Sequence, residues 1–95
     1  MITLEDVRNY LDITYEDEDI DRKLTGIMTR AEAHVRELAA AEENELTDTE
    51  SQLVLDCCRY IWNDAFEDFA NNFLGTVNGA RAKREIAAAE VDDSG

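Results

Sequence analysis

The sequence contains no proline and only four glycines, so few residues in it would interrupt a helix. It has no glycine-rich phosphate loop, no Gly-x-Ser-x-Gly motif and no Ser/His/Asp set, and no stretch of 18 apolar residues occurs. The opening segment, Met1 to Asp6, lacks the basic region and apolar run of a secretion signal. We therefore expect a soluble protein made in the cytoplasm, with no membrane partner, no cofactor and no enzymatic activity.

Cysteine is also scarce, and the two that occur, Cys57 and Cys58, are adjacent. Neighbouring side chains on a helix point about 100° apart, so this pair is poorly placed for a disulfide. We interpret both as small apolar residues buried in a protein of a reducing compartment.

Basic residues are few: 9 Lys+Arg stand against 23 Asp+Glu, giving a net charge of −14. Free DNA and anionic membranes are bound through Lys and Arg, so neither is expected as a direct partner. Residues 1–50 carry a net charge of −10, whereas residues 80–95 carry −1. An end with three basic residues and almost no net charge would suit head-to-tail packing against the acidic body of another copy. Ordinary solvated surface charge, or a high-salt cytoplasm, would also account for the balance.

Apolar residues recur every three or four positions and predict helices. A short helix should begin at Thr3, where Asp6 completes a capping box, and should end near Asp12. A second helix should follow the acidic segment Glu16 to Asp19 and continue to about Ala40. Its apolar face is formed by Ile20, Leu24, Ile27, Met28, Ala31, Val35 and Leu38.

The stretch from Thr47 to Leu74 predicts the longest helix. Thr47 and Glu50 form a capping box at its start, Gly75 supplies a stop, and no Gly or Pro lies between. At 1.5 Å per residue, such a helix would be a rod of about 40 Å. Its broad apolar face consists of Leu53, Val54, Cys57, Cys58, Ile61, Trp62, Phe66, Phe69 and Phe73.

The six residues 41–46 should join the second and third helices as an antiparallel pair. After Gly75, the dipeptide Asn78-Gly79 indicates a turn, and Ala80 to Glu90 indicates a helical arm with too few large apolar residues to fold alone. We predict an all-α fold, a small helical bundle of a short N-terminal helix, two long antiparallel helices and a C-terminal helical arm. Residues 1–74 would form the bundle, and residues 75–95 a turn and an arm for contact with a partner subunit.

Two acidic segments resemble metal sites in part. The segment Asp17 to Asp21 begins like a calcium loop, but Arg22 stands where the loop needs glycine and Met28 where it needs glutamate. Asp64, Glu67 and Asp68 have helical spacing, but a di-metal bundle needs a repeated Glu-x-x-His, and the single histidine, His34, lies in another segment. We expect no metal; His34 is interpreted as a partly exposed helix residue.

Four segments together resemble a known family: the opening Met1 to Leu11, the acidic Tyr15 to Ile20 leading into Leu24 to Met28, the segment Ala31 to Val35, and the aromatic Arg59 to Phe66. The chain resembles the small head-tail connector proteins, also called head completion or adaptor proteins, of long-tailed double-stranded DNA phages and related viruses. The resemblance covers about residues 1–74. After Gly75 the chain departs from the family pattern, because family members often end in a proline-containing helix.

The resemblance implies a structural virion protein at the head-tail interface, the neck, assembled in the host cytoplasm. It implies a ring of about twelve copies beneath a portal protein, which extends the DNA channel and docks a stopper or tail-completion protein. DNA would pass through the channel without specific binding, and an acidic wall would suit that passage. Candidates for contact with the portal or a neighbouring subunit are Arg81, Lys83, Arg84 and Ile86. Candidates for the channel wall are Glu16, Asp17, Glu18, Asp19, Glu42, Glu43 and Glu45.

An alternative function comes from another class of protein. A small acidic helical protein could be a DNA mimic that inhibits a nucleic-acid-binding host protein, with its carboxylates imitating phosphates. This function would require acids spaced along one face like a duplex, whereas most acids here lie at predicted helix starts and links.

Overall fold

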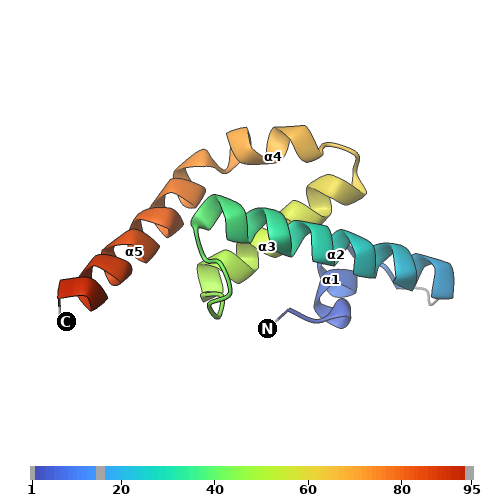
Figure 1. Cartoon of the computed structure of the whole chain (residues 1–95). Coiled ribbons are helices and arrows are strands. Elements are labelled where there is room, and N and C mark those ends of the chain that lie inside the picture. Colours follow the sequence, from blue (N-terminus) through green and yellow to red (C-terminus); the bar gives the residue numbers. More distant parts are fainter. Residues whose placement is uncertain (1, 15–16, 94–95) are drawn as a thin grey trace.

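A computed structural model describes residues 2–14 and 17–93, with side chains described as far as residue 89, and this part of the chain is an all-α helical bundle without strands (Figure 1). The predicted fold class is confirmed. The helices are α1 (Leu4–Tyr10), α2 (Glu18–Ala39), α3 (Asp48–Trp62), α4 (Phe66–Asn72) and α5 (Leu74–Asp93). None of the helices in the described residues is long and apolar enough to cross a membrane.

The first two helices begin and end close to the predicted positions. Thr3 and Asp6 form the capping box of α1, with each side chain accepting from the other's backbone N–H, at 3.1 and 2.9 Å. Asp17 caps α2 by accepting from the N–H of Asp19 at 2.8 Å. The end of α2 is set by Ala40, whose φ of 56° lies in the left-handed region. Local capping chemistry therefore determines these boundaries.

The single rod expected from Thr47 to Leu74 is wrong. Its start is correct, because Thr47 and Glu50 form the predicted capping box, but α3 ends at Trp62. Asn63 then donates from its side chain to the carbonyl of Arg59, and Asp64 adopts a φ of 58°. Asp tolerates this left-handed conformation better than most residues, so Asp64 can turn the chain after the helix without glycine.

The turn after α3 lets the aromatic residues that follow it fold back onto the bundle. Phe69 is fully buried, with its ring centroid 5.8 Å from that of Tyr60 and 5.0 Å from that of Phe73. Phe66 lies on α4 with its ring centroid 4.7 Å from that of His34 on α2. Ring packing across α2, α3 and α4 is thus the physical reason for the break, since burying these rings outweighs continuing one helix.

The predicted stop at Gly75 and the predicted turn at Asn78-Gly79 are also wrong. Both glycines lie inside α5, and neither has a positive φ. Val77 and Ala80 are buried in the common core. Their burial stabilises the helical conformation of this segment, although it contains glycine and asparagine, which have low helix propensity. The helix expected from Ala80 onward therefore begins at Leu74. The predicted division of roles between residues 1–74 and 75–95 stays a prediction.

The core lies mainly between α2 and α3, which runs back across α2 (Figure 1). Both cysteines are fully buried and free, as interpreted from the sequence. Burial raises the pKa of Cys57 to about 12 and that of Cys58 to about 11, so neither is a thiolate at neutral pH. Their role is packing. The fully buried residues include Val7, Leu24, Ala31, Ala39, Leu53, Val54, Cys57, Cys58 and Phe69.

Candidate interface at the junction of α3 and α5

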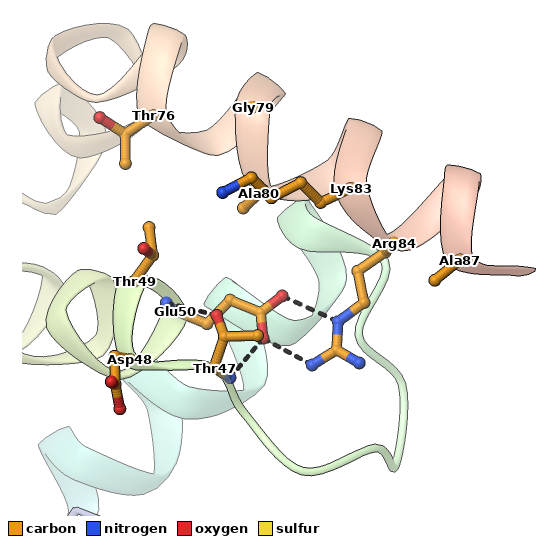
Figure 2. A pocket seen from close by; sticks show the side chains of 10 residues that line it. All are labelled: Thr47, Asp48, Thr49, Glu50, Thr76, Gly79, Ala80, Lys83, Arg84 and Ala87. Carbon is orange, nitrogen blue, oxygen red and sulfur yellow. Dashed lines mark hydrogen bonds and ion pairs between the residues drawn. The ribbon is translucent and has the colours of Figure 1, made fainter.

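A cleft of about 550 Å³ lies between the start of α3 and the middle of α5 (Figure 2). It forms because α5 diverges from the rest of the bundle after its first turns (Figure 1). One wall consists of Thr47, Asp48, Thr49 and Glu50, and the other of Thr76, Gly79, Ala80, Lys83, Arg84 and Ala87. Four of the six residues on the α5 wall have small side chains, so few side-chain atoms fill the cleft on that side.

The two walls are joined by an ion pair between Glu50 and Arg84 (Figure 2). Arg84 Nε donates to Glu50 Oε2 at 3.0 Å, and Arg84 Nη2 donates to Glu50 Oε1 at 2.6 Å. The same Nη2 donates to the backbone carbonyl of Glu45 at 2.6 Å. The guanidinium therefore contacts both α3 and the loop before it. This two-pronged geometry is the strong and directional form of an arginine–carboxylate contact.

Glu50 also maintains the start of α3. Its Oε1 accepts from the backbone N–H of Thr47 at 2.9 Å, and its own N–H donates to Thr47 Oγ1 at 3.2 Å. The Glu50 side chain is only 1% exposed, against 20% for Arg84. Hydrogen bonding from Arg84 and Thr47 holds the pKa of Glu50 below its ordinary value although burial opposes this, and Glu50 raises the pKa of Arg84. Both groups therefore stay charged at neutral pH.

The structure places the four predicted contact residues of the arm in different environments. Arg84 is engaged by Glu50, so its guanidinium is directed into the bundle rather than toward a partner. Arg81 pairs with Glu85 on the same exposed helix face, at 3.2 Å. Lys83 is exposed on the wall of the cleft, and Ile86 is 58% exposed. Lys83 and Ile86 thus remain available on the surface of α5.

Glu50 is the residue of this site that sequence reasoning missed. Its place in a capping box was visible from the Thr47 spacing, but its second partner lies 34 residues further along the chain. An acid at the third position of a helix is ordinary, so no local signal marked it as a tertiary contact.

The predicted channel acids form two clusters at opposite ends of α2. Asp17, Glu18 and Asp19 are exposed at its start, whereas Glu42, Glu43 and Glu45 are exposed in the loop after its end. Helix α2 has 22 residues, which corresponds to about 33 Å at 1.5 Å per residue. Glu16 lies outside the described residues. On the single chain, these six described candidates therefore lie in two separate patches rather than on one continuous face.

The remaining candidates from the sequence are a histidine in the ring cluster and three exposed acids. His34 is half-buried between α2 and the rings of Phe66 and Phe69. Asp64, Glu67 and Asp68 are exposed, and within the described residues no group of three or more metal-binding side chains is close enough to hold an ion.

A polar contact between α1 and α3 was not predicted. Tyr10 donates from its hydroxyl to the buried carboxylate of Asp56, and Gln52 Nε2 donates to the Tyr10 oxygen at 3.5 Å. The hydrogen bond to Asp56 is the main cause of a raised Tyr10 pKa. Tyr10 therefore connects the short first helix to the core.

Comparisons of the chain with family models, with curated proteins and with solved structures found no match. Evidence about function comes from the charge, exposure and geometry of the residues described above.

Proposed function

We propose that the protein is a ring-forming head-tail connector of a tailed virus, a structural virion protein that binds beneath the portal. It would extend the DNA channel and provide the docking surface for a stopper or tail-completion protein. The observation that carries the proposal is the projecting second half of α5, residues 81–89, which we call distal α5. Eight of its nine residues, all except Arg84, are exposed, including Lys83 and Ile86.

Distal α5 has the properties of a segment that is completed by a partner. Leu74 and Ile86, both on α5, are the two large apolar residues identified as exposed in the described part of the chain. An isolated helix of this length gains little from its own backbone hydrogen bonds, and most helical stability in proteins comes from packing of a face. A neighbouring subunit or the portal would supply that packing.

The charge of the surface also supports a connector. Several of the few basic side chains are held inside the fold: Arg8 pairs with Asp21 at 3.0 Å, and Arg36 donates to the carbonyls of Glu42 and Asn44, both at 2.7 Å. Arg84 is held by Glu50. The exposed surface therefore retains an excess of carboxylates, and a channel wall with this charge would not grip passing DNA phosphates.

The DNA-mimic alternative receives less support from the arrangement of charges. A mimic needs a continuous row of acids, but the six described channel candidates lie in two patches separated by the length of α2. Exposed Arg22, Lys23 and Arg30 lie along that helix. Lys23 Nζ lies 5.1 Å from the ring centre of Trp62, and the Arg30 guanidinium lies 4.3 Å from that of Phe66. These cations would interrupt an imitation of duplex phosphates.

The test is co-expression of the chain with the portal protein of the same virus, followed by negative-stain electron microscopy of purified particles. We expect an added ring beneath the portal with the wild-type chain. A chain that ends at Glu85 keeps Val77, Ala80 and Arg84 but lacks Ile86 and the residues after it, and should lose the ring. Thr29→Glu, which adds a charge at an exposed site on α2, serves as the control and should keep it.

Bare portals with the wild-type chain would overturn the connector proposal. If the free chain instead bound tightly to a basic nuclease or repressor, the DNA-mimic function would replace it. Rings that persist with the shortened chain would show that Ile86 and the residues after it are not needed for assembly, and would contradict the role proposed for the projecting end of α5.

A further inference from the structure

We infer that the Glu50–Arg84 ion pair is a latch that fixes the direction in which distal α5 projects from the bundle. The latch is a property of the single chain, and only its contribution to ring assembly rests on the proposed function. It would hold distal α5 in one orientation before any partner binds.

The position of Arg84 along α5 supports this role. Val77 and Ala80 anchor the first turns of the helix in the core. Between residues 81 and 89, only Arg84 is partly buried, and the other eight residues are exposed. The guanidinium is therefore the last described attachment between α5 and the rest of the bundle. Without it, the helix would be held only through residues 74–80.

The geometry of the pair makes it directional. Glu50 is also held by Thr47, through the backbone N–H and the hydroxyl of that residue, so its carboxylate has contacts on α3 that do not depend on Arg84. A planar guanidinium that bonds to both carboxylate oxygens can do so in few orientations, unlike a lysine ammonium. The additional bond to the Glu45 carbonyl adds a third fixed point. These three points determine the angle of α5 as well as its attachment.

The latch also ties together the two walls of the cleft. The contacts join α3 and α5 at the end of the cleft marked by Arg84, while Thr76 and Gly79 line the part nearer the start of α5 (Figure 2). Because the pair is largely buried, solvent ions screen it less than an exposed surface pair. We therefore expect the orientation to persist at physiological salt.

Amide hydrogen exchange of the full chain, read by mass spectrometry, tests the latch. Glu50→Gln removes the charge but retains a side-chain oxygen that can accept from Thr47, so it separates the latch from the helix cap. Arg84→Met removes the guanidinium and keeps a residue of similar helix propensity. In both variants the amides of residues 81–89 should exchange about tenfold faster, whereas those of α2 should be unchanged.

Arg81→Met is the matched control. It makes the same substitution on the same helix, but it removes only an exposed pair within α5. Its effect on exchange of residues 81–89 should stay within about twofold. Arg84→Lys should give an intermediate rate, because the charge remains and the two-pronged contact is lost.

Three results would overturn the latch. The first is unchanged amide exchange of residues 81–89 in both Glu50→Gln and Arg84→Met. The second is exchange that Arg81→Met accelerates as much as Arg84→Met does. Alternatively, the amides of α2 could accelerate equally, which would show that the pair stabilises the whole fold rather than the direction of α5.

The portal experiment then separates the latch from the proposed function. If the exchange result holds but the wild-type chain leaves portals bare, the connector proposal fails and the latch stands. If wild-type rings form and the Glu50→Gln chain forms them equally well, the latch has no role in assembly. If Glu50→Gln reduces ring formation while Arg81→Met does not, the latch orients distal α5 for assembly.

Discussion

The α2–α3 body and distal α5 are held in place by different forces. In the body, two amphipathic helices bury rows of aliphatic residues, both cysteines and the ring of Phe69. Distal α5 buries no large apolar side chain and is attached through Arg84. Apolar burial is strong and non-directional, whereas a two-pronged ion pair is weaker overall and strongly directional. The comparison indicates that the body supplies stability and that a polar contact supplies the orientation of the arm.

The largest effect should follow from removing an aromatic ring in the body. Phe69→Ala deletes a fully buried ring that contacts Tyr60, Phe73 and His34. We expect the free energy of unfolding to fall by about 3–5 kcal/mol, as for other buried aromatic truncations. Urea unfolding followed by circular dichroism would measure it. Leu74→Ala, at an exposed α5 position, is the control, and a similar loss there would contradict the assignment of stability to the body.

A smaller loss is expected at the junction of body and arm. Glu50→Ala removes both the capping contact and the ion pair, and we expect a loss of about 2–3 kcal/mol in the same unfolding experiment. Glu50→Gln should lose less, because the amide oxygen can still accept from Thr47. Equal losses in the two variants would show that the ion pair, rather than the cap, accounts for the contribution of Glu50.

The same junction should respond to acid. Because the pKa of folded Glu50 lies below its ordinary value of 4.5, its contribution to stability is present above about pH 4.5 and is lost as pH falls through the lower folded pKa. The stability difference between wild type and Glu50→Gln should therefore be constant near neutral pH and shrink below pH 4.5. Unfolding curves collected from pH 7 to pH 3 test this. A difference that grows on acidification would contradict the sign.

The smallest expected effect concerns the helical state of the arm itself. Gly79 lies inside α5, and no atom outside its own helix lies within 4 Å of a Cβ built there. Gly79→Ala should therefore stabilise the protein by about 0.5–1 kcal/mol through helix propensity. If Asn78-Gly79 instead formed the turn that the dipeptide suggests, alanine would be strained there and stability would fall. Thermal unfolding distinguishes the two signs.

The candidate site was only partly visible in the sequence. Lys83 and Ile86 were predicted as contact residues and are exposed on α5. Arg84 was predicted for the same surface but is bound within the chain. Charge and composition identify residues that could meet a partner, but they do not reveal which of them an internal carboxylate has already engaged.

The sequence by itself determined the all-α class, the capped starts of α1 and α3, the acidic start of α2, and the apolar rows that meet between α2 and α3. These features depend on residues within one or two turns of each other, which local chemistry relates directly. The tertiary structure alone decided the break at Asn63 to Ala65, the helix through Asn78-Gly79 and the contact of Glu50 with Arg84. Each of these depends on partners far apart in the chain, because ring packing, burial of Val77 and Ala80, and a long-range ion pair outweigh the local preference.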